Sequence, residues 1–207
     1  GHIIQVWLKR RAAADEAAEP APEFFGARAA RRRLHPIGAL GAESCTEQLG
    51  RPGRWHERLP HFRLDFTPSS GEELQTEYLL PRANALAPLG AVRGLRAQVS
   101  PLLLISEIRT VAADRLWLSP CYQTPCVAVH FTWRPNWPAV SQLLPRLEAV
   151  LAPLGARPHW GKLFTMAPAQ VQAGYPRLAD FRQLLNDNDP NGKFRNAFVE
   201  RYIFGQG

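Results

Sequence analysis

The stretch Val127-Ala-Val-His-Phe-Thr-Trp133 decides the fold, because its apolar and polar residues alternate as they do in a half-buried β-strand. Side chains two residues apart in a strand point to the same face of the sheet. One face therefore carries Ala128, His130 and Thr132. The opposite face carries Val127, Val129, Phe131 and Trp133. The pattern predicts a strand with one face in the core and a polar face turned away from it.

A second alternating stretch, Leu104-Ile-Ser-Glu-Ile-Arg-Thr-Val111, lies upstream. It places Glu107 and Arg109 on one face and Ile108 on the other, so we expect Ile108 to lie in the core. If the two strands pair, Glu107, Arg109, His130 and Thr132 form one polar patch. Such a patch is either an ordinary ion pair and polar surface on a solvated sheet face or a functional site.

The turn Arg157-Pro-His-Trp-Gly-Lys162 also places ionisable groups within apolar sequence. Removing a charged group from water is costly unless the group is paired or used, so residues of this kind are candidates for a site. Lys162 is the strongest candidate in the turn. His159 and Trp160 either position their neighbours or contact a cofactor.

Strands and helices follow one another in an order that predicts an α+β fold. Strands are expected at 61–66, 75–80, 102–111 and 127–133, and helices at 83–99 and 137–154. This order predicts an antiparallel sheet with the helices packed on one face and the other face free to cover a ligand. The predicted domains are an N-terminal strand at Ile3–Leu8 with an Ala/Pro/Arg-rich linker (1–40), the α+β domain (41–165), and a C-terminal helical extension (166–207).

Composition narrows the class of protein. The chain has 207 residues, of which 45% are hydrophobic, so it can bury a sizeable core. The net charge of +7 raises the alternative of a basic nucleic-acid-binding protein. However, the dense run Arg31-Arg-Arg33 lacks both interleaved aromatic residues and a recognition helix, so we expect no nucleic-acid partner.

Neither a membrane segment nor a metal site is expected. No apolar run approaches the roughly 20 residues that a transmembrane helix needs. The three cysteines, Cys45, Cys121 and Cys126, have no metal-ligand spacing and form an odd number, as suits buried thiols in a reducing compartment. We therefore expect a cytoplasmic protein without membrane association, disulfide or bound metal.

The Glu-x-Arg strand, the His-x-Thr strand and the His-Trp-Gly-Lys turn occur in an order that resembles the aldonolactone and alditol oxidases. These enzymes are a branch of the vanillyl-alcohol-oxidase-type flavoproteins. The resemblance runs from about Val6 onward and is strongest to the C-terminal substrate (cap) domain of bacterial alditol oxidases. Further matching segments are Ser44–Gln48, Trp55–Phe62, Phe66–Gly71, Trp117–Pro120, Tyr175–Phe181 and Asp189–Phe194.

The resemblance implies that FAD oxidises a primary alcohol of a polyol and that O2 then reoxidises the flavin, giving hydrogen peroxide. Arg109 and Lys162 would supply fixed positive charge, and Glu107 would orient Arg109 and accept hydrogen bonds from substrate hydroxyls. His130 would assist deprotonation, and Thr132 would hold a hydroxyl of the substrate. His159 and Trp160 would contact the cofactor or position the turn.

The glycine-rich cradle for the FAD pyrophosphate is not found in this sequence. We therefore expect the chain to be the C-terminal part of a longer enzyme and to be inactive alone. An FAD-binding domain would lie upstream in the same protein or on a partner chain, and the C-terminal extension would pack toward it. Two alternatives remain open: a sugar-1,4-lactone oxidase of the gulono- or arabinono-lactone type, and a freestanding carbohydrate-binding domain without redox activity.

Overall fold

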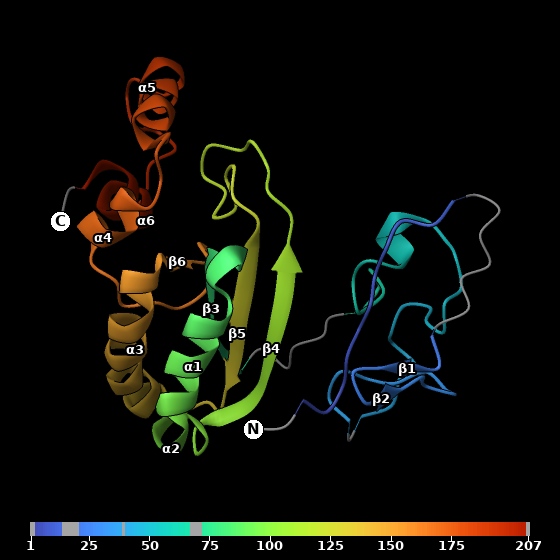
Figure 1. Ribbon diagram of the computed structural model, residues 1–207. Coiled ribbons are helices and arrows are strands. Elements are labelled where there is room, and N and C mark those ends of the chain that lie inside the picture. The colour runs from blue at the N-terminus through green and yellow to red at the C-terminus, as the bar shows by residue number, and fades with distance from the viewer. Residues whose placement is uncertain (1–2, 14–20, 39, 67–71, 206–207) are drawn as a thin grey trace. The chain divides into compact units, whose positions relative to one another are not determined.

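The computed structural model describes residues 3–13, 21–38, 40–66 and 72–205, shown in Figure 1. The chain forms two compact units, Gly1–Gly71 and Glu72–Gly207. This division falls at neither of the predicted domain boundaries, near residues 40 and 165, so the three predicted domains stay a prediction. None of the helices in the described ranges combines the length and apolarity that crossing a bilayer requires.

The first unit contains little regular secondary structure. In its described residues, two short strands, β1 (Glu23–Phe24) and β2 (Ala27–Arg28), form an antiparallel hairpin, and one 3-10 turn, η1, covers Trp55–Glu57. The strand predicted at Ile3–Leu8 is wrong, because this stretch is held by side chains and not by a strand ladder. For example, Gln5 Nε2 donates to His35 O at 3.0 Å.

The strand predicted at 61–66 is also wrong. Within this stretch, the described backbone forms one isolated bridge, between Phe62 and Cys45. Thr46 Oγ1 donates to Pro60 O at 2.6 Å, and Arg63 N donates to Ser44 O at 3.0 Å. Residues 44–46 and 60–63 are therefore held together by scattered contacts, and residues 61–66 form no strand ladder.

The second unit contains the predicted antiparallel sheet, in the strand order β4-β5-β3-β6. Its strands are β3 (Leu74–Pro81), β4 (Leu103–Val111), β5 (Cys126–Trp133) and β6 (Arg157–Pro158). Strand β5 pairs with both β3 and β4, so the stretch that decided the fold lies between two partners. Helices α1 (Leu86–Gly94), α2 (Arg96–Val99) and α3 (Trp137–Leu151) complete this part of the unit, and α1 and α3 lie side by side on one face of the sheet (Figure 1). The predicted α+β class is confirmed.

The core lies between the apolar face of the sheet and α3. Val127, Val129, Phe131 and Trp133 are buried as predicted, and the rings of Phe131 and Trp133 stack with centroids 4.9 Å apart. Helix α3 begins after Asn136, whose side chain accepts from Ala139 N at 3.3 Å. Its leucines at 143, 144, 147 and 151 are buried, which confirms the predicted apolar stripe.

The predicted helix at 83–99 is divided in the structure. A 3-10 turn, η2 (Arg82–Asn84), precedes α1, and the non-helical Leu95 (φ −90°, ψ 6°) separates α1 from α2. Gly90 and Gly94 lower the helical preference of this stretch, so a break next to Gly94 has a local cause. The predicted helix at 137–154 continues beyond α3 as a 3-10 turn, η3 (Ala152–Leu154), before Gly155 with φ +82°.

The prediction that Ile108 lies in the core is wrong, since 52% of its surface is exposed. Its side chain does point to the face opposite Glu107 and Arg109, in register with Val129 of β5. However, β4 is an edge strand, and the core covers Val129 in the neighbouring strand but does not extend to Ile108. Leu104, on the same strand, is also exposed.

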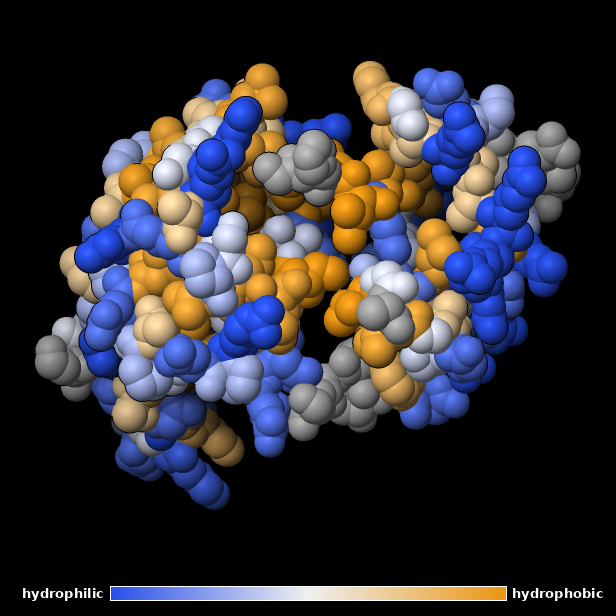
Figure 2. Space-filling model, turned by 90° about the horizontal axis from the view of Figure 1, so that it is seen from below, coloured by the Kyte–Doolittle hydropathy of each residue, from blue (hydrophilic) through white to orange (hydrophobic). Residues whose placement is uncertain are grey.

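Apolar residues reach the surface elsewhere as well. Figure 2 shows them interspersed with polar residues on the surface seen from below.

After β6 the chain is helical, as predicted for the C-terminal extension. Its elements are α4 (Pro168–Ala173), α5 (Leu178–Asn188), α6 (Ala197–Val199) and a π-helical turn, η4 (Glu200–Phe204).

A buried carboxylate, Glu148, ties α3 to two other segments. Its Oε1 accepts from Tyr78 Oη at 2.8 Å and from Thr165 N at 2.7 Å, and its Oε2 accepts from Thr165 Oγ1. Burial, and then the neighbouring Glu148 charge, raise the pKa of Tyr78 well above its ordinary value. The phenol is therefore a permanent donor to Glu148.

Replacing Glu148 with alanine is expected to lower the free energy of unfolding by roughly 2–3 kcal/mol, because it leaves three donors without their acceptor, one of them the buried Tyr78 hydroxyl. Urea unfolding at neutral pH measures the effect. Glu72→Ala, at an exposed carboxylate, is the control and should change stability by less than about 0.5 kcal/mol. Equal losses in the two variants would contradict the prediction.

Candidate active site

The face of the sheet opposite the helices carries one polar row across three strands. In the strand register, His130 of β5 lies opposite Glu77 of β3 on one side and opposite Glu107 of β4 on the other. Thr132 lies two residues along β5 on the same face, next to Gln75 of β3. We call this surface the open face. It contains all four polar residues that the two strand patterns placed together.

Arg109 joins the two carboxylates of this row. Its Nε donates to Glu107 Oε2 at 2.8 Å, and its Nη1 donates to Glu77 Oε1 at 3.0 Å. The guanidinium therefore links its own strand, β4, to β3 across the central strand β5. The expected pairing of Glu107 with Arg109 is present, and the second carboxylate is an addition that the sequence patterns did not identify.

The turn after β6 brings Lys162 to the same place. His159 N donates to Glu77 O at 2.9 Å and Leu163 N donates to Gln75 O at 2.9 Å, so the turn runs alongside β3. Within this turn, Lys162 Nζ donates to Glu77 Oε2 and lies 2.9 Å from His130 Nδ1. The structure thus gathers Arg109, His130 and Lys162 around a common partner, Glu77, and Glu107 joins them through Arg109.

Glu77 was not predicted, although it has more ionisable partners than any of the predicted residues. Its side chain is only 7% exposed and contacts Arg109, His130 and Lys162. Burial opposes its ionisation, but the close contacts with His130 and Lys162 and the charges of Lys162 and Arg109 outweigh burial and hold the pKa of Glu77 well below its ordinary value. Glu77 is therefore a carboxylate at neutral pH. The signal that could have found it is the one used for Glu107: a charged residue within a predicted strand.

His130 is buried between polar partners at both ring nitrogens. Its Nδ1 lies 2.9 Å from Lys162 Nζ and 3.3 Å from Glu77 Oε2. Its Nε2 lies 3.0 Å from Thr132 Oγ1. A ring held at both nitrogens has a fixed orientation and can pass an electrostatic influence from Lys162 to the Thr132 hydroxyl.

His159 and Trp160 separate within the turn. His159 Nδ1 accepts from Gly161 N at 3.1 Å, and the residue is exposed. Trp160 Nε1 donates to Leu118 O at 2.9 Å, and its ring lies 4.8 Å from that of Tyr175. Trp160 therefore fixes the turn against the loop before β5 and against the C-terminal segment, while the exposed His159 is accessible to a ligand.

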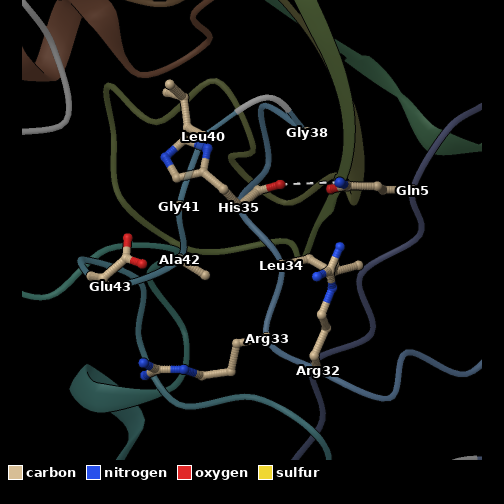
Figure 3. A pocket seen from close by; sticks show the side chains of 10 residues that line it. All are labelled: Gln5, Arg32, Arg33, Leu34, His35, Gly38, Leu40, Gly41, Ala42 and Glu43. Atoms are coloured by element: carbon tan, nitrogen blue, oxygen red, sulfur yellow. Dashed lines mark hydrogen bonds between the residues drawn. The ribbon is translucent and has the colours of Figure 1, made fainter.

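A separate pocket of about 430 Å³ lies in the first unit (Figure 3). Arg32, Arg33 and His35 are among its lining residues, and Gln5 reaches across it to the His35 carbonyl. None of the predicted site residues lines this pocket. In the described part of the chain, no group of three or more His, Cys, Asp or Glu side chains is arranged to hold a metal ion. All three cysteines are buried and free.

Comparison with known proteins confirms the resemblance drawn from the motifs. The pattern of the D-arabinono-1,4-lactone oxidase family matches residues 72–202, which is nearly all of the second unit. An alditol oxidase from Streptomyces sp. is 52% identical over 97% of this chain and 47% of its own length. An L-gulonolactone oxidase from Scyliorhinus torazame is 32% identical over 47% of the chain and 23% of its own length. An L-gulono-1,4-lactone dehydrogenase from Mycobacterium tuberculosis is 28% identical over 62% of the chain and 30% of its own length. The chain thus spans about half the length of this alditol oxidase and less of the lactone-oxidising relatives.

Proposed function

Since this chain belongs to the D-arabinono-1,4-lactone oxidase family, we propose that it forms the substrate-binding part of an FAD-dependent oxidase of primary alcohols on polyols such as xylitol or sorbitol. The observation that carries the proposal is the convergence of Glu107, Arg109, His130, Thr132 and Lys162 on the open face. An alditol is favoured over a lactone because the similarity to an alditol oxidase extends over 97% of the chain.

The open face offers the hydrogen-bonding groups that a polyol requires. A polyol presents several hydroxyls, each of which can donate and accept. Glu107 accepts hydrogen bonds, Arg109 donates them, and Thr132 can do either. These groups lie on neighbouring strands, so they can hold successive hydroxyls of an extended substrate. We assign substrate binding to Thr132 and Glu107 and orientation of the reacting end to Arg109.

Alcohol oxidation requires that the hydroxyl proton be removed and that negative charge on oxygen be stabilised. We assign His130 the role of assisting deprotonation, which its contact with Thr132 allows it to do by favouring negative charge on the oxygen that loses its proton. Arg109 and Lys162 are fixed cations beside it, held by Glu77 and Glu107. Preorganised positive charge in a partly buried site stabilises a developing alkoxide.

The same cations fit an FAD cofactor, whose reduced form is anionic. When bound, FAD would take the hydride from the alcohol carbon and return the electrons to O2, giving hydrogen peroxide. The exposed His159 is the proposed contact to the cofactor, with Trp160 holding the turn in place. We propose that the remaining FAD-binding elements lie on a domain upstream in the same protein or on a partner chain, and that the enzyme acts in the cytoplasm.

Substrate preference provides the test. The full-length protein is expected to oxidise xylitol or sorbitol with kcat/KM more than about tenfold above that for L-gulono-1,4-lactone, because hydroxyl contacts along an open chain discriminate strongly when they are unmet. Peroxide release in a coupled assay measures both rates. Faster oxidation of the lactone would favour a lactone oxidase, and polyol binding without peroxide would favour a carbohydrate-binding domain.

A further inference from the structure

Glu77 holds a central position in the candidate site. Its two oxygens have different partners: Oε1 accepts from Arg109 of β4, and Oε2 accepts from Lys162 of the turn. The side chain is almost fully buried, so these partners replace water as its source of hydrogen bonds. A carboxylate in this position determines what each neighbouring group can donate or accept.

The neighbouring protons follow from this arrangement. A lysine paired with a buried carboxylate is an ammonium group, which only donates hydrogen bonds. Lys162 Nζ lies 2.9 Å from His130 Nδ1, so Nδ1 must be the acceptor. The proton of a neutral His130 ring is then on Nε2, which donates to Thr132 Oγ1 at 3.0 Å. Thr132 accepts this bond and keeps its own hydroxyl proton to donate elsewhere.

The opposite arrangement, in which the neutral His130 ring carries its proton on Nδ1, fits the distances around Nδ1 less well. It would require His130 Nδ1–H to donate to Glu77 Oε2, and these atoms lie 3.3 Å apart. It would also direct an N–H group toward the Lys162 ammonium, which is the nearer neighbour of Nδ1. Two donors facing each other at hydrogen-bonding distance repel, so the first arrangement is the stable one.

We propose that Glu77 is a positioning residue that orients a chain of hydrogen bonds from Lys162 through His130 to Thr132, so that the Thr132 hydroxyl donates to an oxygen of the substrate. The inference rests on the proposed function for the identity of that substrate, an alcohol. Every bond in the chain points away from the Lys162 ammonium. A donor at its end favours an oxygen that carries negative charge, as the substrate oxygen does when its proton leaves.

The test reads the proton position directly. In full-length protein labelled with 15N-histidine, long-range 1H–15N correlation spectra distinguish the two neutral forms of His130, whose signal is assigned by its loss in His130→Gln. The expected result is the form protonated on Nε2, whether or not a substrate is oxidised. A ring protonated on Nδ1, or on both nitrogens at neutral pH, would overturn the inference.

Two variants separate positioning from stability. Glu77→Gln keeps the shape but removes the charge, and Glu77→Asp keeps the charge but shortens the side chain. Both are expected to shift the His130 signals and to lower kcat with xylitol by roughly tenfold, because small misplacements of reacting groups slow catalysis. Glu148→Gln, at a buried carboxylate in the core, is the control and should lower the melting temperature without shifting the His130 signals.

The outcomes are distinguishable. If both Glu77 variants behave like Glu148→Gln, Glu77 is structural only and the inference is wrong. If Glu77→Gln does not fold, Glu77→Asp alone decides between these results, with its His130 spectrum as the deciding measurement. If the wild-type protein oxidises no polyol but shows the Nε2-protonated ring, the proposed function fails while the hydrogen-bond chain stands.

Discussion

Replacing Lys162 with alanine is expected to slow the reductive half-reaction of the full-length enzyme with xylitol or sorbitol by about 10²–10³-fold, because it removes the cation that we propose to act mainly on the developing negative charge. The side chain is 17% exposed, so its charge is only partly screened by water. Glu77 keeps Arg109 and His130 as partners in this variant. The effect on rate should therefore exceed the effect on stability.

Anaerobic stopped-flow measurement of flavin absorbance follows this step without interference from O2. Lys193→Ala is the matched control, since Lys193 lies over the exposed Phe194 ring and is far along the chain from the site residues. It should react at the wild-type rate. A Lys162→Ala variant that keeps the wild-type rate but melts at a lower temperature would show that Lys162 only stabilises the fold.

Arg109→Lys is expected to slow the same half-reaction by about 10²-fold even though the positive charge remains. The guanidinium uses separate nitrogens to reach Glu107 and Glu77, which lie on different strands. An ammonium is a single point of charge and cannot reproduce this planar, two-sided contact. We therefore expect one carboxylate to lose its partner and the reacting end of the substrate to lose its orientation.

The matched control is Arg146→Lys, which changes an exposed arginine on α3 that donates to Gln98. Its rate should be that of the wild type. Steady-state kinetics add a second criterion: loss of orientation should lower kcat, whereas loss of substrate binding alone should raise KM with kcat unchanged. An Arg109→Lys variant with both constants unchanged would exclude a role for the guanidinium geometry.

Much of the second unit could be predicted from sequence because its central strand has an unambiguous pattern. The alternation in β5 identified both its buried and its polar face, since each is set by a period of two. The position of Ile108 could not be predicted in the same way. Alternation gives the face on which a side chain lies, but not whether that strand is at the edge of the sheet, where the core stops covering it.

The first unit shows the opposite case. Short apolar runs such as Ile3–Leu8 satisfy a strand pattern, yet a strand forms only where a partner with free backbone groups is present. In the described part of this unit the paired strands are two residues long. Side chains such as Gln5 and Thr46 hold the remaining segments, and contacts of this kind leave no periodic signal in the sequence.

Glu77 is the site residue that short sequence motifs could not predict. Its partners lie 32, 53 and 85 residues away, at Arg109, His130 and Lys162. Each partner belongs to a short recognisable motif, whereas Glu77 belongs to no such motif and is the one charged residue of β3. The residues predicted from motifs do come together in the structure, and their catalytic roles stay predictions. The residue that joins them becomes visible only once the strand register is known.

The large sequence separation of the Glu77 contacts affects how the protein folds. A nascent sheet of β3 and β5 alone would leave Glu77 with His130 but without Arg109 and Lys162, and a half-paired carboxylate has to remain hydrated. Water can leave the open face only after β4 and the turn that follows β6 have docked. The open face therefore loses its water in the same cooperative step that completes the tertiary structure. A folding intermediate that lacks the turn would have native-like strand pairing and a hydrated open face.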